Sequence, residues 1–166
     1  MRVGHGFDVH AFAAGRPLVL GGVEVPHDRG LAGHSDGDVL LHAIIDALLG
    51  AAGLGDIGKM FPSDDERWAG ASSRELLSRA YAAVRRHSGQ SIRNLDATVV
   101  AEAPRLETHI PDMRRTIAAT LHLPVRAVNV KATTTDGLGF TGRGQGIAAF
   151  AVVLLDSTIT NQQTSG

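Results

Sequence analysis

Gly146-Ile-Ala-Ala-Phe-Ala-Val-Val-Leu-Leu155 is the stretch that decides the fold, because it contains almost no polar residue. A strand with one face in water alternates apolar and polar side chains, whereas a run this apolar is typical of a strand covered on both faces. The helices of the same domain can cover one face, and a partner chain can cover the other. The sequence therefore predicts a doubly buried strand close to the end of the chain.

The rest of the chain alternates between strand and helix patterns, which predicts an α/β domain with a mixed sheet. We expect strands over 1–9, 17–25, 91–101 and 127–133, and helices over 36–51, over 72–87 and from Pro111 onward. Ser72-Ser-Arg-Glu75 matches the capping box that opens a helix. The connection 53–71 is long enough to predict a functional or mobile loop.

Composition limits the class of protein. With 166 residues the chain is long enough for one domain, which we place at 1–156, followed by a polar tail over 157–166 that we expect to be disordered. A net charge of -1 gives no basic field for nucleic acid, and zero Cys means that a metal site must use His and carboxylates. No secretory signal or apolar run of about 20 residues is present, so we expect a cytoplasmic protein without membrane contact.

Asp8, His10 and His42 form a candidate metal site. Asp8 and His10 are two apart in an extended segment, so they leave the same face of a strand, and His42 lies on the first predicted helix. Two His and one carboxylate suit Zn²⁺, and three protein ligands leave the fourth position open, as in catalytic sites. The alternative is that these histidines lie near the core without a metal.

Two further segments carry groups that bind phosphate. His34-Ser-Asp-Gly-Asp38 precedes the helix of His42, and helix N-termini favour anions. Lys131-Ala-Thr-Thr-Thr-Asp136 ends a strand with three hydroxyls and a carboxylate, which can bind phosphate oxygens and a hard cation. Helix capping or strand propensity would explain each segment alone, but their recurrence at the ends of successive elements favours a phosphate-handling site.

Motifs in a fixed order resemble a known family. They are Gly4-His-Gly-Phe-Asp-Val-His10, His34-Ser-Asp-Gly-Asp38, Asp46-Ala-Leu-Leu-Gly-Ala-Ala52, Gly55-Asp-Ile-Gly58, Phe61-Pro62, Ala103-Pro104, His109-Ile-Pro111, Asn129-Val-Lys-Ala-Thr-Thr-Thr135 and Leu138-Gly-Phe-Thr-Gly-Arg-Gly144. Over residues 1–155 the chain closely resembles the 2-C-methyl-D-erythritol 2,4-cyclodiphosphate synthase family of the non-mevalonate isoprenoid pathway. The resemblance implies a single domain with a chorismate-mutase-like fold, in which a four-stranded mixed sheet and an N-terminal hairpin carry helices on one face. It also implies a homotrimer with active sites between subunits.

The resemblance also implies a lyase reaction, in which 4-diphosphocytidyl-2-C-methyl-D-erythritol 2-phosphate closes to the cyclodiphosphate and releases CMP. Asp8, His10 and His42 would hold Zn²⁺, and Asp136 would hold a second divalent cation, Mg²⁺ or Mn²⁺. His34 and Thr134 match the transition-state stabilisers. The implied substrate-binding residues are Ser35, Asp56, Ile57, Gly58, Phe61, Pro62, Ser63, Asp64 and Asp65, then Ala101, Glu102, Ala103, Pro104, Arg105, Leu106 and Glu107, and finally Thr133, Thr135, Phe140 and Arg143.

The sequence departs from the family pattern at three positions. Asp136 stands where the family has Glu, which shortens the side chain by one bond, about 1.5 Å. Gln145 replaces a Glu and Phe150 replaces a polar residue, both near the implied threefold axis. Because Arg143 there lacks acidic partners, we expect a phosphate or an isoprenoid diphosphate on the axis. The alternative is that Phe150 fills the axial cavity and Arg143 turns to solvent or to a neighbouring carboxylate.

Two other functions remain open on the sequence. A zinc-dependent phosphohydrolase would activate water on the same metal, release inorganic phosphate and need no cytidine. A non-catalytic trimeric zinc-binding module would use the metal only to tie a loop to a helix.

Overall fold

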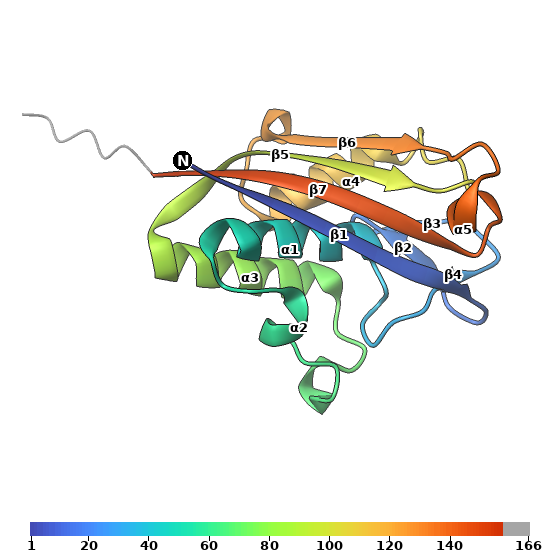
Figure 1. Cartoon of the computed structure of the whole chain (residues 1–166), viewed down its shortest axis with the longest axis horizontal. Helices are drawn as coiled ribbons and strands as arrows, with labels where there is room; N and C mark the ends of the chain where they lie inside the picture. The colour runs from blue at the N-terminus through green and yellow to red at the C-terminus, as the bar shows by residue number, and fades with distance from the viewer. Residues whose placement is uncertain (158–166) are drawn as a thin grey trace, which may run out of the picture.

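The computed structural model describes residues 1–157, which form a mixed α/β domain (Figure 1). Its elements are β1 (Arg2–Ala13), β2 (Leu18–Leu20), β3 (Val23–Val25), β4 (Gly30–Leu31), α1 (Val39–Ala52), α2 (Ile57–Met60), the 3₁₀ turn η1 (Glu66–Trp68), α3 (Ser73–Ser88), β5 (Gln90–Val100), α4 (Ile110–Thr120), the 3₁₀ turn η2 (Val125–Ala127), β6 (Val128–Thr133), α5 (Gly139–Gly142) and β7 (Gly146–Ser157). The predicted tail lies outside the described residues except for its first member, which ends β7. No helix within 1–157 is long and apolar enough to cross a membrane.

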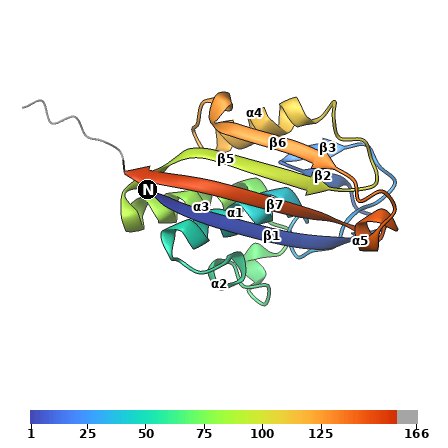
Figure 2. The same cartoon turned by 45° about the horizontal axis from the view of Figure 1, so that its top comes forward.

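The main sheet has five strands in the order β4-β1-β7-β5-β6. Strand β7 is antiparallel to both β1 and β5, and β5 is parallel to β6, so the sheet is mixed as predicted. Figure 2 shows the four long strands side by side, with α1 and α3 behind them. The expected count of four strands omitted β4, a two-residue strand that pairs with the end of β1.

The predicted strand 17–25 is wrong, because this segment turns back on itself. Gly21 and Gly22 have φ of 60° and 73°, and they join β2 to β3 as a separate two-stranded hairpin. Two consecutive residues at positive φ are the requirement of a tight hairpin turn. Both glycine N–H groups donate to the carboxylate of Asp38, at 2.9 and 2.6 Å. Strand β1 therefore pairs with β7 and β4, and the separate β2–β3 hairpin corresponds to the N-terminal hairpin that the resemblance implied.

Helix α1 packs directly against β1 at two glycines. A Cβ added to Gly4 would lie 1.8 Å from the backbone oxygen of Ala47, and one added to Gly6 would lie 1.9 Å from that of Ala43. The strand and the helix backbone therefore approach more closely than any side chain allows. Nearly all of α1 is buried at this contact and against the neighbouring helices, as its apolar sequence requires.

The opposite face of the sheet carries no helix (Figure 2). Phe7, Phe150 and Val152 lie there with 47%, 41% and 43% of their surface exposed, and the rings of Phe7 and Phe150 are 4.7 Å apart. Within one chain β7 is thus covered on one face only. Among the described residues nothing packs on its second face, which the sequence predicted to be buried as well. The apolar patch is of the kind that marks a protein interface.

The start of α3 is as predicted, but its cap is not. Ser72 is the N-cap residue and makes no side-chain capping hydrogen bond. Glu75 pairs with Arg79 instead of reaching back, at 2.7 Å. The carboxylate of Asp36 takes the role of the cap and accepts from the backbone N–H of Ser73 at 3.0 Å.

The close approach of α1 to β1 predicts that Gly6→Ala destabilises the fold by about 3 kcal/mol, because the new methyl group meets helix backbone that cannot move aside alone. Urea denaturation measures the free energy of unfolding. Gly50→Ala is the control, on the helix that Gly6 contacts, since the new Cβ would meet nothing closer than 4.0 Å. We expect that control to stabilise α1 by about 0.5–1 kcal/mol. An unchanged midpoint for Gly6→Ala would show that the two backbones can separate without cost.

Candidate active site

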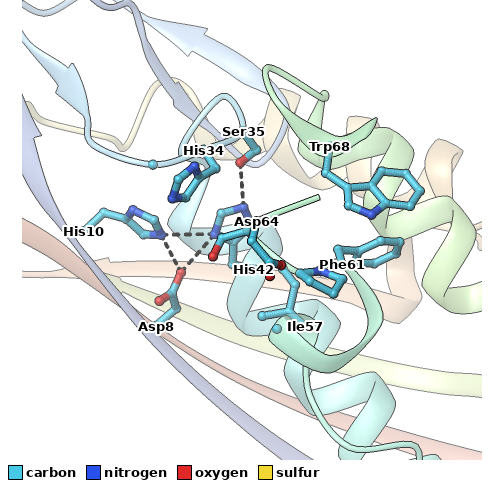
Figure 3. Close-up of a pocket in the computed structure, with 13 residues that line it drawn as sticks. Asp8, His10, His34, Ser35, His42, Ile57, Phe61, Asp64 and Trp68 are labelled. Carbon is cyan, nitrogen blue, oxygen red and sulfur yellow. Dashed lines mark hydrogen bonds and ion pairs between the residues drawn. The ribbon is translucent and has the colours of Figure 1, made fainter. Parts of the chain in front are cut away.

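Three ligand-type atoms meet where β1 faces α1 (Figure 3). Asp8 Oδ2 lies 2.8 Å from His10 Nε2 and 3.0 Å from His42 Nδ1, and the two nitrogens are 3.1 Å apart. Alternation along β1 places Asp8 and His10 on the same face as the two glycines that admit the helix. The structure thus brings together the three residues expected to hold a metal.

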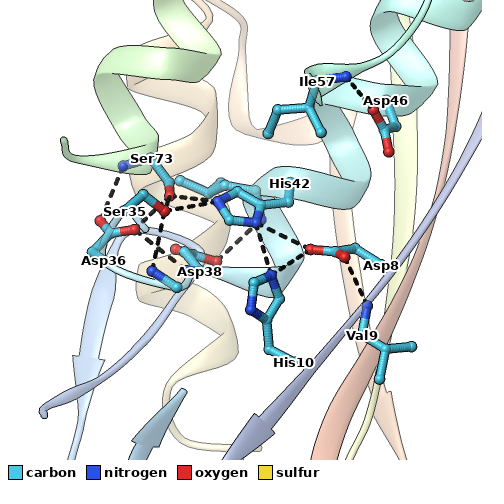
Figure 4. A network of polar contacts seen from close by, with 12 residues as sticks. Asp8, Val9, His10, Ser35, Asp36, Asp38, His42, Asp46, Ile57 and Ser73 are labelled. Atoms are coloured by element: carbon cyan, nitrogen blue, oxygen red, sulfur yellow. Dashed lines mark hydrogen bonds and ion pairs between the residues drawn. The ribbon is translucent and has the colours of Figure 1, made fainter. Parts of the chain in front are cut away.

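The far nitrogen of each imidazole is hydrogen-bonded to the protein, and Figure 4 shows this contact for His42. His10 Nδ1 contacts the backbone oxygen of Ala32, to which it can only donate. His42 Nε2 lies 2.9 Å from Ser73 Oγ and 3.1 Å from Ser35 Oγ. When the far nitrogens carry the hydrogens, the near nitrogens direct lone pairs at the same point as Asp8. This arrangement is the usual one for histidines that bind metal.

The spacing of the three atoms fits a small divalent ion. Zinc bonds of 2.0–2.1 Å in a tetrahedron place neighbouring ligand atoms about 3.4 Å apart, slightly more than the three separations found here. Within residues 1–157 this is the one group of three or more His, Cys, Asp or Glu side chains close enough to share an ion. Two His and one carboxylate suit Zn²⁺ and also non-haem ferrous iron.

Asp8 supplies the negative charge of the site. Burial by itself would raise the pKa of this carboxyl group, but hydrogen bonds from His10 and His42, together with their charges, hold its pKa well below the usual value. Burial acts on His10 in the opposite sense, and contact with Asp8 outweighs it, so the pKa of His10 is raised. An ionised carboxylate between two imidazoles is therefore ready to bind a cation.

A cavity of about 630 Å³ opens beside the three ligands. It is lined by Asp8, His10, Gly33, His34, Ser35, His42, Ile57, Gly58, Phe61, Pro62, Ser63, Asp64 and Trp68. The long loop 53–71 supplies much of this wall, as its length suggested. Phe61 and Trp68, both in this wall, meet edge to face with ring centroids 5.0 Å apart.

Helix α1 also positions the short helix α2 at this cavity. Asp46, one turn after His42, accepts from the backbone N–H of Ile57 at 2.7 Å. Two expected substrate-binding acids have other partners here. Asp56 caps α2 by accepting from Lys59 N, and Asp65 caps η1 and pairs with Arg67. Neither lines the cavity.

The remaining expected site residues gather in a second group, at the ends of β5 and β6. Ala101 N donates to the backbone oxygen of Thr133 at 3.0 Å, and Thr134 Oγ1 donates to Asp136 Oδ1 at 2.9 Å. The register aligns Asp8 with Ala132 across β7 and β5, which is three strand spacings or about 14 Å. No residue of 101–107 or 133–136 lines the cavity.

Phe140 and Arg143 lie in or directly after α5, also away from the cavity. Phe140 is 38% exposed, and Arg143 contacts the side-chain oxygen of Gln145 at 3.4 Å. The glutamine that replaces the family acid is thus a neutral partner of Arg143. This contact is equally consistent with a bound anion on the implied threefold axis and with an axial cavity filled by Phe150.

Trp68 and Ser73 belong to the site although they were not among the residues expected there. Trp68 is the one tryptophan of the chain and lies in the loop already singled out by its length, so a signal existed. Ser73 lay inside the predicted capping box, and its contact with His42 depends on how α3 packs against α1, which no local pattern encodes.

Comparison with known proteins identifies the family of the chain. The family model of the YgbB family matches residues 1–156. The 2-C-methyl-D-erythritol 2,4-cyclodiphosphate synthase of Chromohalobacter salexigens is 59% identical over 160 residues, which is 96% of this chain and 98% of that protein.

Solved structures show the same fold. A CDP-bound 2C-methyl-D-erythritol-2,4-cyclodiphosphate synthase has a TM-score of 0.85 at 37% identity, over 93% of this chain and 100% of its own. The bifunctional IspDF of Campylobacter jejuni has a TM-score of 0.90 at 48% identity, over 95% of this chain and 42% of its longer one. The chain therefore belongs to the YgbB family, the family of the cyclodiphosphate synthases that its sequence resembles.

Proposed function

We propose that this chain is a metal-dependent 2-C-methyl-D-erythritol 2,4-cyclodiphosphate synthase of the non-mevalonate pathway, with residues 1–156 as its functional unit. The observation that carries the proposal is the convergence of Asp8, His10 and His42 on one edge of a cavity, in a chain whose relatives bear that name. In the reaction an oxygen of the 2-phosphate attacks the β-phosphorus. The bond between that phosphorus and the bridging oxygen breaks, and CMP leaves with this oxygen, so no water is consumed.

We assign Zn²⁺ to Asp8, His10 and His42, and Mg²⁺ or Mn²⁺ to Asp136. When bound, the two ions supply positive charge that offsets the repulsion between the reacting phosphates. Thr134 and Asp136 already touch each other, so a phosphate oxygen contacted by the threonine would be next to the cation site. Little is left for a general base, because the attacking phosphate is already an anion.

The cavity would bind the methylerythritol part of the substrate. His34 lies on the loop before α1, where its exposed ring can reach a phosphate at the mouth of the cavity. The hydroxyl of Ser35 is bonded to His42 and to Gly37 N, so we assign the backbone N–H of Ser35, and not its side chain, to the substrate. Ile57 and Phe61 provide the apolar part of the wall.

We further propose that the complete site forms between neighbouring copies in a homotrimer of chorismate-mutase-like subunits. Within one chain β7 lies between β1 and β5, and both β7 and β5 lie between β1 and β6, and the cavity contains only the metal group. The exposed patch of Phe7, Phe150 and Val152 gives the copies an apolar surface to share. Residues 101–107 and Thr133 of one copy would then bind the cytidine of a substrate held by the metal group of the next.

The first test is the product. We expect the purified protein, with Zn²⁺ and Mg²⁺, to convert the cytidyl substrate to equal amounts of cyclodiphosphate and CMP. Phosphorus NMR separates the cyclic product from inorganic phosphate. Release of inorganic phosphate would favour a phosphohydrolase, and no turnover at all would favour a zinc-binding module.

The second test concerns the role of the metal. His42→Ala should abolish turnover and remove zinc, yet leave the fold intact, because α1 is held by the apolar core and by its backbone contact with β1 at Gly4 and Gly6. Metal analysis and circular dichroism measure the two properties. An unfolded variant would make the metal structural, and iron in place of zinc in the wild type would change the proposed ion.

The third test asks whether active sites are shared between subunits. His42→Ala and Asp136→Ala should each be inactive, because each removes a different metal. When the two are refolded together at equal amounts, random trimers regain about a quarter of the wild-type activity per subunit, since each mixed trimer contains one intact site. Mixing His42→Ala with Asp8→Ala is the matched control, because both changes damage the same group and no pairing repairs it. Recovery no greater than in this control would place the whole site within one chain.

A further inference from the structure

We propose that Arg16 is a positioning residue for substrate phosphate, because its guanidinium holds the backbone of the segment Gly33-His34-Ser35 in place beside the cavity. The proposal rests on the function proposed above, in which this segment contacts the substrate. Arg16 itself lies in the loop between β1 and β2 and does not line the cavity. It would therefore act through the backbone of the segment and would not touch the substrate.

The side chain of Arg16 bridges two carbonyl groups of this segment. Arg16 Nη1 donates to the backbone oxygen of Gly33 at 2.7 Å, and Nη2 donates to the backbone oxygen of Ser35. The carbonyl between them, that of His34, accepts from Gly70 N at 2.8 Å. Three consecutive carbonyl groups are thus bound by residues from outside the segment. Arginine suits this role because its planar guanidinium presents several N–H donors in a rigid fork.

The directions of these carbonyl groups determine where the N–H groups of the segment point. The peptide bonds here are trans, so an N–H points opposite to the carbonyl of its own peptide unit. Arg16 therefore fixes the N–H of His34, which shares a peptide unit with the Gly33 carbonyl, and Gly70 fixes the N–H of Ser35 in the same way. Neither N–H donates a hydrogen bond within residues 1–157, and both residues line the cavity (Figure 3). The two donors are available to a phosphate oxygen.

The charge of Arg16 strengthens this effect. In the described part of the chain the two carbonyl oxygens are its hydrogen-bond partners, and no carboxylate there pairs with it. A hydrogen bond to a carbonyl oxygen polarises the peptide unit and makes its N–H a better donor, and a charged donor polarises it most. The N–H of His34 therefore gains both a fixed direction and a larger positive partial charge.

The backbone of Arg16 is itself held against β4. A Cβ added to Gly30 in that strand would lie 2.7 Å from the backbone oxygen of Arg16 and 2.2 Å from that of Pro17. Pro17 also restricts the backbone conformation of the residue before it. The guanidinium therefore extends from a fixed point, and only the side chain of Arg16 has to be ordered for the bridge to form.

The experiment compares Arg16→Ala and Arg16→Lys with wild type in the full chain supplied with Zn²⁺ and Mg²⁺. We expect Arg16→Ala to raise KM for the cytidyl substrate by about tenfold and to leave kcat nearly unchanged, because the N–H groups hold a phosphate in both the ground state and the transition state. Amide NMR during titration with inorganic phosphate should show the His34 and Ser35 signals shift in wild type. In Arg16→Ala the same shifts should need about tenfold more phosphate.

Arg16→Lys separates charge from geometry. Lysine keeps the charge but lacks the planar fork that spans both carbonyl groups, so KM should also rise, by less than in Arg16→Ala. A wild-type KM in Arg16→Lys would show that charge alone is sufficient, and the bridging role would then be wrong. If Arg16→Ala does not fold, Arg16→Lys decides the proposal alone.

Arg29→Ala is the matched control, because it removes the same charge from the segment between β3 and β4. Arg29 stacks on Phe12 and lies near Asp28, and it makes no hydrogen bond to the segment 33–35. The control should leave KM and the phosphate response unchanged. If Arg16 served stability alone, Arg16→Ala would lower the melting temperature without changing either property of the folded protein, and that result would overturn the proposal. A wild type without turnover would contradict the proposed function, while the phosphate titration would still decide the role of Arg16.

Discussion

The structure depends on the contact between the backbones of α1 and β1 at Gly4 and Gly6. Because neither residue has a side chain, the helix lies directly on the strand, and His42 comes within 3.0 Å of Asp8. Any larger residue at either position would force the helix backbone away from the strand and would move His42 away from Asp8. Gly4 and Gly6 therefore determine both how closely α1 packs on β1 and where His42 lies relative to Asp8.

Two carboxylates in the loop before α1, those of Asp36 and Asp38, connect α1 to other elements of the domain. Asp38 is fully buried, which raises its pKa to about 6, and it accepts from the N–H groups of Gly21, Gly22 and Leu41. It thereby fixes the β2–β3 hairpin to the start of α1. Asp36 does the same for the start of α3. The segment 32–38, between β4 and α1, therefore joins the β2–β3 hairpin, α1 and α3.

The sequence predicted most elements because their signals are local. The apolar run of β7, the alternation in β1 and the buried face of α4 each follow from neighbouring residues. The errors came from partners distant in sequence. Residues 17–25 look like one strand until Asp38 is seen to bind the Gly21–Gly22 turn, and the cap of α3 comes from Asp36, 37 residues before Ser73. The metal ligands could be named early, whereas the role of Ser73 required the packing of α3 on α1.

The metal group and the group at the ends of β5 and β6 differ in whether they require a second copy of the chain. The three candidate metal ligands come together within one chain, and groups of that same chain contact the far nitrogens of both histidines. On the proposed assembly, the group at the ends of β5 and β6 serves the neighbouring copy, and the apolar face of β1 and β7 brings the copies together. On this proposal a single subunit is sufficient to bind the metal, whereas binding of the whole substrate requires the trimer. Since association is linked to concentration, dilution would remove turnover before it removed the metal, because the exposed face can separate without disturbing the contact of α1 with β1.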